Sequence, residues 1–172
     1  AQAQTEKLTA LVNALVTLSR MDEGVSPLKM EPFPLSEAVA DTAEPFRDLA
    51  QSNGHDLVLD IVPELTYKGD EYAIRQLVSI LLDNAVKYAR ADSPITLTLE
   101  KTRRGIALRC RNGSDPIPED TLTKLFDRFY RADPSRSAAT GGFGIGLSIA
   151  RSIAEAHRGS ICARMAGEEV EF

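Results

Sequence analysis

Three side chains that suit a metal ion, a phosphate and a base follow one another at helical spacing in the middle of the sequence. Asn84, Lys87 and Tyr88 stand three and four positions apart, so on a helix they share one patch. An amide oxygen suits Mg²⁺, an ammonium group suits a phosphate, and a phenol ring can lie against a base or sugar. The same spacing also fits an ordinary polar helix edge with an extended lysine.

Glycines are concentrated further along, between Thr140 and Arg151, where four of them fall within six residues. Glycine permits a positive φ and lets a ligand approach the backbone without a Cβ in the way. The apolar pattern that follows predicts a helix, whose N-terminus offers unpaired N–H groups to an anion. We interpret the stretch as a phosphate cradle, although such loops also occur as simple tight turns.

Two further segments place polar side chains beside predicted elements. Asn112 lies in a segment rich in turn-forming residues, 111–118, and its amide can both donate and accept, as reading an adenine edge requires. Asn-Gly is also a favoured turn pair that needs no ligand. Arg128 and Arg131 flank two aromatic residues. Arginines there either meet the negative charge of a γ-phosphate or form a solvated face.

Hydrophobic periodicity predicts the elements that must hold these groups. Helices are expected at 1–23, 36–53, 71–89, 119–130 and 146–157. Strands are expected at 28–33, 55–62, 94–100, 106–110 and 161–165, with a stub at 170–172. Ser36 is expected to cap the second helix, and residues 131–142 to form a mobile loop. Interspersed helices and antiparallel hairpins favour an α+β two-layer sandwich with one helical layer.

The composition excludes several classes of protein. The chain has 172 residues, of which 43% are hydrophobic and 26% charged, and its net charge of -5 argues against nucleic acid as the main partner. No apolar run approaches the ~20 residues that a membrane span needs. Cys110 and Cys162 lie in apolar, strand-like segments and are interpreted as buried free thiols. The absence of a CxxC motif argues against a zinc site.

Three segments, in this order and at this spacing, resemble the nucleotide-binding boxes of sensor histidine kinases. Residues 76–89 resemble the N box, residues 125–131 the F box, and residues 142–150 the second glycine box. The resemblance covers nearly the whole chain. It implies the GHKL ATPase fold, a mixed and mostly antiparallel sheet packed on about three helices, with the nucleotide held between helices and a flexible lid at about residues 119–141.

The resemblance also implies roles for single residues. Asn84 would coordinate Mg²⁺, Lys87 would contact phosphate, and Tyr88 would line the pocket for ATP. The glycines of the second box would let the end of the lid wrap the phosphates, whereas His157 is interpreted as structural. The nucleotide-binding residues expected on this basis are Asn84, Lys87, Tyr88, Asn112, Ile117, Arg128, Phe129, Arg131, Gly142, Gly144, Gly146 and Leu147.

Two positions depart from the family pattern. The run from Asn112 to Ile117 replaces the usual first glycine box, and Asn112 stands where an adenine-reading Asp is expected. An amide oxygen accepts from the adenine amino group without charge assistance, so we expect weaker, but not abolished, nucleotide binding. Ile80 stands where many members carry Asn or His, so one polar support of the metal site is missing.

The phosphoacceptor histidine of such kinases is absent, because neither His55 nor His157 lies in a matching helix. Residues 1–24 are expected to be the C-terminal end of the dimerisation and phosphoacceptor hairpin, and residues 25–172 the catalytic ATP-binding domain with a truncated last strand. The resemblance therefore implies ATP-dependent transfer of the γ-phosphate to a histidine upstream, on a helical hairpin of the same protein or its dimer mate. Onward transfer to a response regulator would follow. The parent is expected to be a cytoplasmic signalling protein, soluble or membrane-anchored.

Other functions remain open. A GHKL ATPase motor, such as a chaperone, topoisomerase or mismatch-repair protein, carries a catalytic Glu one turn before the metal-binding Asn, where this chain has Ile80. The unusual first glycine box suggests a non-catalytic nucleotide-sensing module. Serine kinases that bind sigma factors share these boxes but do not need the N-terminal helix.

Overall fold

The structure is a computed structural model that describes residues 28–132 and 144–172, together with residues 4, 5, 8, 9, 12, 13, 15, 16 and 19. These N-terminal positions are helical, as the sequence predicts, and they expose apolar side chains such as Leu8 and Val12. In the part of the chain that the structure describes, no helix is both long enough and apolar enough to cross a membrane.

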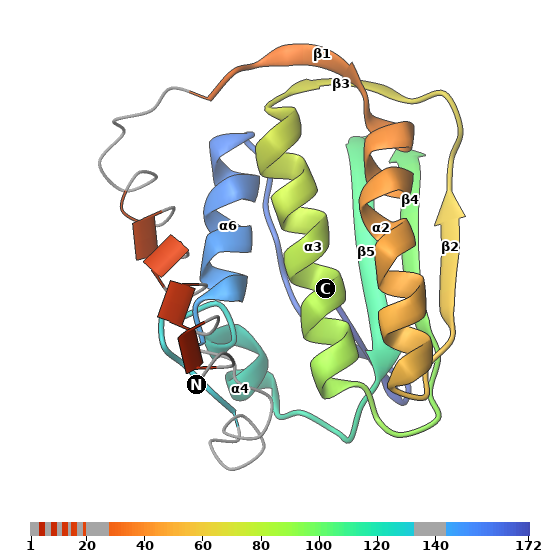
Figure 1. The fold of residues 1–172 in the computed structure, drawn as a ribbon, viewed down its shortest axis with the longest axis vertical. Helices are drawn as coiled ribbons and strands as arrows, with labels where there is room; N and C mark the ends of the chain where they lie inside the picture. The colour runs from red at the N-terminus through yellow and green to blue at the C-terminus, as the bar shows by residue number, and fades with distance from the viewer. Residues whose placement is uncertain are drawn as a thin grey trace.

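Two layers form the body of the molecule, a sheet and a row of helices that cover one of its faces (Figure 1). The described residues place five strands in this sheet, in the order β2-β4-β5-β7-β6, with β2 and β4 parallel and the other pairs antiparallel. The predicted α+β two-layer sandwich is thus confirmed. The strands are β2 (Leu57–Ile61), β4 (Ile95–Thr102), β5 (Gly105–Gly113), β6 (Arg164–Ala166) and β7 (Glu169–Glu171). The helices of the layer are α2 (Leu35–Ser52), α3 (Glu71–Tyr88) and α6 (Gly146–Ala156).

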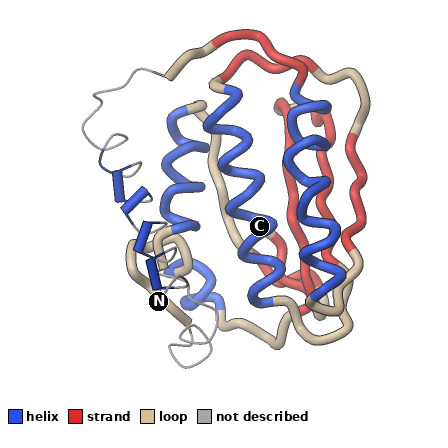
Figure 2. The backbone as a smooth tube through the Cα atoms, in the orientation of Figure 1, coloured by secondary structure: helices blue, strands red, loops and turns tan. Residues whose placement is uncertain are grey.

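A separate antiparallel ribbon crosses one end of the helical layer (Figure 2). It pairs β1 (Glu31–Pro34) with β3 (Thr66–Gly69), and Phe33 lies opposite Tyr67 with their rings edge to face at 6.1 Å. The sequence predicts a strand near β1 but not β3, because four residues of mixed polarity carry too short a pattern to read.

Helix α3 lies in the middle of the layer and is well specified by its sequence. The Asp70 carboxylate accepts from the Ala73 N–H at 3.0 Å and so caps the first turn. Val78 and Leu82 are fully buried, and burial of a leucine side chain stabilises the fold by about 1.5–3 kcal/mol. Both predicted ends of this helix are confirmed to within one residue.

Ser36 does not cap α2, contrary to the prediction. Helix α2 begins one residue earlier, and Pro34 precedes it without a side-chain cap. The Ser36 hydroxyl instead donates to the Val62 carbonyl at 2.6 Å and accepts from the Leu65 N–H at 2.9 Å. A partner from a distant loop therefore replaces the local one that the pattern suggested.

Strand β5 continues through the segment where the sequence predicts a turn. Asn112 pairs with Ile95 of β4 on one side and Val170 of β7 on the other, so pairing on both edges overrides the Asn-Gly turn preference. Beyond it, α4 (Glu119–Lys124) is half as long as the predicted helix at 119–130. The predicted loop at 131–142 lies almost wholly outside the described residues.

The two cysteines differ in their exposure to solvent. Cys110 is buried and free, as predicted, and burial raises the pKa of its thiol to about 12. Cys162 is exposed, which corrects the prediction, because it precedes β6 instead of lying within a core strand. An apolar run by itself does not say which side chains face the core.

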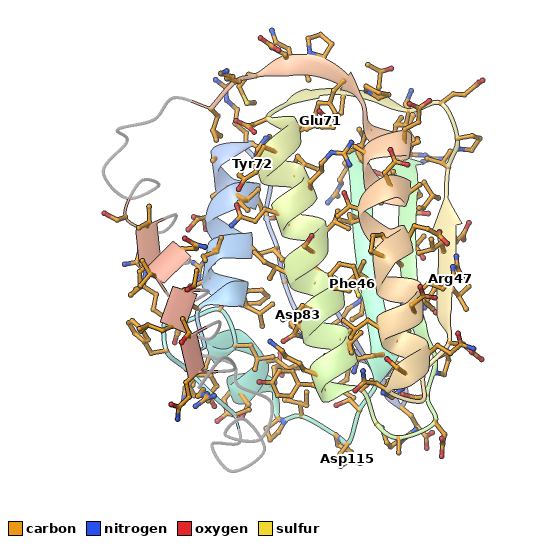
Figure 3. All side chains as sticks on the ribbon, in the orientation of Figure 1. Phe46, Arg47, Glu71, Tyr72, Asp83 and Asp115 are labelled. Atoms are coloured by element: carbon orange, nitrogen blue, oxygen red, sulfur yellow. The ribbon has the colours of Figure 1, made fainter. Side chains whose placement is uncertain are left out.

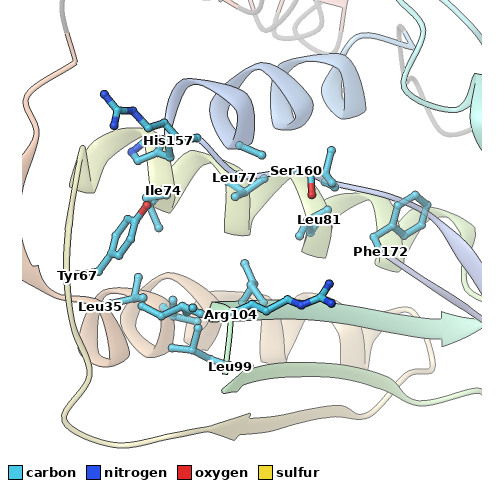
Figure 4. A pocket seen from close by; sticks show the side chains of 18 residues that line it. Leu35, Tyr67, Ile74, Leu77, Leu81, Leu99, Arg104, His157, Ser160 and Phe172 are labelled. Carbon is cyan, nitrogen blue, oxygen red and sulfur yellow. The ribbon is translucent and has the colours of Figure 1, made fainter. Parts of the chain in front are cut away.

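A cavity of about 340 Å³ lies between the helices and the far end of β5 (Figure 4). Tyr67 and His157 line one end of this cavity and Phe172 the other. Within the described residues, β5 is paired with β4 along its whole length but with the β7 segment only from Cys110 onward. The cavity lies beside the unpaired part of that edge and away from the predicted phosphate-binding side chains.

Candidate nucleotide-binding site

The C-terminal half of α3 presents the predicted metal and phosphate ligands. Asp83 marks this half of the helix, whereas Glu71 and Tyr72 mark its opposite end (Figure 3). Asn84 is half-buried, and within the described chain its amide makes no hydrogen bond to protein. The Lys87 ammonium lies 2.7 Å from the Asp83 carboxylate, one turn earlier on the same helix. An amide and an ammonium group are therefore available side by side.

Strand β5 brings Asn112 to the last turn of α3. Cys110, on the same face of the strand, donates from Sγ to the Leu81 carbonyl, and the Arg90 N–H donates to the Gly113 carbonyl at 2.8 Å. Strand and helix therefore run side by side between these two contacts. Asn112 is 1% exposed, so its amide lies in the interior at the level where α3 ends.

Tyr88 belongs to the same end of the helix. It stands seven residues after Leu81, nearly two full turns, so the two side chains leave the same face of the helix. Its side chain is 39% exposed, which leaves one side of the ring open to solvent. A partly exposed aromatic ring at the end of α3 is a surface on which a purine base can stack.

The two segments that resemble the F box and the second glycine box meet directly. The Phe129 N–H donates to the Gly144 carbonyl at 2.8 Å. Gly144 has a φ of +71°, and a Cβ there would lie 2.8 Å from the Tyr130 carbonyl oxygen. Glycine is thus required at this position for its conformation and for the close approach of the two backbones.

Helix α6 begins beside α3, close to the predicted metal ligand. A Cβ on Gly146 would lie 3.4 Å from the Ile80 side chain, so Ile80 packs at the contact between the two helices. Asn84 stands one turn beyond Ile80 on the same side of α3. The first turn of α6, with half-buried Leu147, therefore starts near the Asn84 amide.

The remaining predicted residues are less closely gathered. Ile117 is half-buried in the loop between β5 and α4, Arg128 and Phe129 are exposed, and Arg131 is half-buried. Both arginines already interact with other groups of the protein. Gly142 lies outside the described residues.

No protein-only metal cluster accompanies these residues. Across the described positions, no three or more His, Cys, Asp or Glu side chains gather as a metal site would require. An ion at Asn84 would therefore depend on oxygens from a ligand and from water, which is how Mg²⁺ is commonly bound in nucleotide sites.

His157 ties the start of α3 to the end of α6. Its Nε2 accepts from the Asp70 N–H at 3.0 Å, while its Nδ1 donates to the Ile153 carbonyl at 2.8 Å. These two bonds fix one neutral tautomer. They agree with the structural role predicted for this histidine.

Sequence reasoning missed the residues that support Asn112 from behind. The loop from Arg90 to Ser93 packs on Gly113, where a Cβ would lie 2.5 Å from the Ser93 side chain. His55 is 6% exposed and its Nδ1 donates to the Ser93 carbonyl at 2.9 Å. The only signal in the sequence was an isolated histidine at position 55, and the sequence did not indicate its partner.

Comparison with known proteins decides between the families that share such a site. Residues 69–172 match the model of the family described as histidine kinase-, DNA gyrase B- and HSP90-like ATPases. The chain belongs to this ATPase family. Within the family, it corresponds to the catalytic ATP-binding domain of sensor histidine kinases, as its named relatives show.

Two relatives illustrate the likeness to this branch of the ATPase family. The signal transduction histidine-protein kinase BaeS of Escherichia coli is 33% identical over 162 residues, which are 94% of this chain and 35% of BaeS. The sensor histidine kinase YkoH of Bacillus subtilis is 36% identical over 148 residues, 86% of this chain and 31% of YkoH. The chain thus spans about a third of the length of the curated relatives it matches.

Solved structures share the fold. The catalytic domain of the histidine kinase ThkA superposes with a TM-score of 0.74 at 24% identity, covering 84% of this chain and 93% of that one. Full-length ShkA in complex with AMPPNP gives a TM-score of 0.79 at 22% identity, covering 96% of this chain and 34% of that one. The predicted GHKL ATPase fold is confirmed.

Proposed function

We propose that this chain is the part of a sensor histidine kinase that binds ATP with Mg²⁺ and delivers the γ-phosphate to a histidine on another segment. The observation that supports this most directly is the C-terminal half of α3, which carries Asn84 and Lys87 one turn from the contact with α6, while β5 brings the buried Asn112 to the end of the same helix. Each offers the polar group that one part of a nucleotide needs.

The residues present fit the ion and the nucleotide. The Asn84 amide is half-buried and makes no hydrogen bond to protein in the described chain, so its oxygen is available as a hard ligand. A bound Mg²⁺ would neutralise charge on the phosphates. Lys87 would exchange its contact with Asp83 for a phosphate oxygen, and the N–H groups at the start of α6 would face the same anion.

The chemistry asked of this chain is mainly positioning. Phosphoryl transfer needs the γ-phosphate held in line with its acceptor and its negative charge stabilised, with little covalent work by the protein. A fixed α3, a glycine contact between Phe129 and Gly144, and arginines at 128 and 131 are suited to that task. The nucleophilic histidine nitrogen would come from a helical hairpin of the same protein or its dimer mate.

The domain organisation is part of the proposal. Residues 1–24 would end the helical hairpin, and their exposed apolar positions, among them Leu8, Val12, Leu15 and Val16, support helix packing with a partner. Residues 25–172 would form the catalytic domain.

Partners and location are inferred from the relatives. One of the similar solved structures is that of ThkA in complex with the response regulator protein TrrA, which supports a response regulator as the onward acceptor here. We place the parent's catalytic part in the cytoplasm, in a soluble or membrane-anchored sensor, because the relatives are named as signal transduction kinases.

The ATPase-motor alternative is disfavoured by one contact. The position that would need a water-activating carboxylate is Ile80, whose side chain packs against Gly146 between α3 and α6. A methyl group in that contact cannot act as a base.

Calorimetry tests the proposal. The chain should bind a non-hydrolysable ATP analogue in the presence of Mg²⁺ and bind it more weakly after chelation. Absence of binding at millimolar analogue would refute it. The transfer step is tested by supplying the parent's histidine-bearing hairpin in trans with labelled ATP, where label should appear on the hairpin and not on this chain.

A further inference from the structure

Helix α6 runs antiparallel to α3 and contacts it at both ends (Figure 1). At the start of α6, a Cβ on Gly146 would lie 3.4 Å from the Ile80 side chain. Just after its last turn, the His157 Nε2 accepts from the Asp70 N–H at 3.0 Å, at the start of α3. The first contact is apolar and has no preferred direction, whereas a hydrogen bond is sensitive to distance and angle. The hydrogen bond therefore restrains how far α6 can slide along α3.

The imidazole of His157 is held by its other neighbours as well. Its Nδ1 donates to the Ile153 carbonyl at 2.8 Å, four residues back on α6. Gly69 packs directly against the ring, because a Cβ there would lie 2.9 Å from the His157 Cδ2. The Tyr67 ring follows, with its centroid 6.1 Å from that of the imidazole. A ring held in this way does not turn to follow a displaced helix, so a shift of α6 would break the bond to Asp70.

Asp70 is the fixed side of this contact. One oxygen of its carboxylate accepts from the Ala73 N–H at 3.0 Å and caps α3, and the other accepts from the Lys29 N–H at 2.9 Å. The Asp70 carbonyl accepts from the Ile74 N–H at 3.0 Å. These bonds set the backbone at Asp70 and with it the direction of the N–H that His157 accepts from. The start of α3 is thus a firm reference point for the placement of α6.

We propose that His157, through its hydrogen bond to Asp70, is a positioning residue for the phosphate groups of the nucleotide. The bond holds the end of α6, and a rigid helix of 11 residues, about 16 Å long, carries that placement to its first turn, where N–H groups face the phosphates. A displacement of about 1 Å is enough to impair close contacts of this kind.

The proposal rests on the proposed function, because it takes the start of α6 to meet a phosphate. It goes beyond that function by assigning part of the nucleotide affinity to a residue at the opposite end of the helix. A histidine that only stabilised the fold would leave the affinity of the folded protein unchanged. A positioning histidine lowers that affinity when its bond to Asp70 is lost, even where the protein stays folded.

Two amide substitutions separate the two hydrogen bonds of the imidazole. The amide of glutamine extends as far from Cβ as Nε2 does, and that of asparagine only as far as Nδ1. His157→Gln therefore keeps an acceptor for the Asp70 N–H, whereas His157→Asn keeps a donor for the Ile153 carbonyl and loses the link to α3. The second arrangement already occurs in this chain. Asn53 at the end of α2 donates from Nδ2 to the Leu49 carbonyl, four residues back, at 2.8 Å.

Calorimetry with Mg²⁺ and a non-hydrolysable ATP analogue is performed on the whole chain, at a temperature where melting profiles show each variant folded. We expect His157→Asn to bind the analogue at least about tenfold more weakly than wild type, and His157→Gln to stay within about threefold. Wild-type affinity in His157→Asn, or equal losses in the two variants, would overturn the proposal and leave the proposed function intact. Failure of the wild-type chain to bind would refute both.

A measurement on the wild-type chain tests the same link without any variant. Coupling between two sites is reciprocal, so a phosphate bound at the start of α6 must also strengthen the bond that holds its end. Hydrogen exchange of the Asp70 amide, which donates to His157, should slow at least about tenfold when the ATP analogue binds. Exchange of the Ala73 amide, which is bonded within α3, should change little. Equal slowing of both amides, or unchanged exchange at Asp70, would overturn the proposal.

Discussion

The Phe129 N–H donates to the Gly144 carbonyl at 2.8 Å, and both residues adopt a left-handed backbone, with φ of +62° and +71°. Positive φ is unusual for phenylalanine and costs of order 1–3 kcal/mol. The contact joins the segment before residues 133–143 to the segment after them. It therefore fixes the F-box segment and the second-glycine-box segment relative to each other.

Gly144→Ala tests the importance of this contact. The new Cβ would be strained by the φ of +71° and would collide with the Tyr130 carbonyl, so we expect loss of ATP binding together with reduced stability. Gly167→Ala is the control, because Gly167 has a φ of +64° but nothing within 4 Å of its Cβ position. The control substitution should lower the free energy of unfolding by only about 1–2 kcal/mol and leave ATP affinity unchanged. Equal loss of affinity in the two variants would mean that backbone strain alone is responsible.

Lys87→Met should weaken ATP binding by about tenfold or more, because a hydrogen bond between charged groups contributes about 1.5–3 kcal/mol. The same substitution removes an ion pair with Asp83 whose partners are 31% and 48% exposed, which contributes at most about 1 kcal/mol to stability. Asp83→Asn removes that pair but keeps the ammonium, so ATP affinity should hold or rise. Equal losses of ATP affinity in both variants would show that binding depends on the Lys87–Asp83 ion pair and not on the Lys87 ammonium itself.

Asn84→Ala should abolish the Mg²⁺ dependence of nucleotide binding. Because the amide makes no hydrogen bond to protein in the described chain, its removal should leave the melting temperature within about 2–4 °C of wild type. Binding of the ATP analogue is measured by calorimetry with Mg²⁺ and with chelator. A Mg²⁺ dependence equal to that of wild type would assign the ion to other groups.

Alkylation should distinguish the two thiols. The pKa of Cys110 is raised to about 12 by burial, so at pH 8 only about one molecule in ten thousand carries the thiolate that reacts. Cys162 is exposed and should be modified first. Mass spectrometry after brief iodoacetamide treatment should find one label in the native protein and two after denaturation. Prompt labelling of Cys110 in the native protein would contradict its burial under α3.

Acid should weaken the fold in part through Glu171. Burial raises the pKa of this carboxyl, but hydrogen bonds from Arg111 and Arg164 outweigh burial and hold the pKa below its ordinary value of 4.5. The unfolded chain therefore takes up the proton first, and the contribution of Glu171 to stability, complete above pH 4.5, is lost as the pH falls through the lowered value.

Glu171→Gln measures this contribution. The variant should be less stable than wild type at neutral pH, and the gap in unfolding free energy should narrow below about pH 4.5. Glu168→Gln removes an exposed partner of Arg90 and should change little at any pH. A gap for Glu171→Gln that is constant with pH would show that packing, and not charge, explains its effect.

Much of the fold could be predicted from local pattern. Helix α3 was predicted nearly to the residue, because Asp70 caps it and an apolar face repeats along its length. What the pattern could not supply were contacts between distant segments. The length of β5 depends on β7, and the role of Ser36 depends on Val62 and Leu65.

The candidate site also has features that local sequence pattern predicts and features that depend on contacts between distant segments. Asn84 and Lys87 could be recognised because their spacing on one helix is visible in the sequence. The orientation of Asn112 could not, because it depends on a carbonyl held by the Arg90 backbone and, behind that, on His55. A residue type predicts which hydrogen bonds are available, but only its neighbours decide which one is left for a ligand.

Helix α3 faces the sheet with one side and the candidate site with another. Each residue inserted or deleted in a helix rotates everything beyond it by about 100°, so a change in length between Asp70 and Asn84 would misplace the core and the binding groups together. Evolution can therefore alter this helix by substitution but hardly by changing its length.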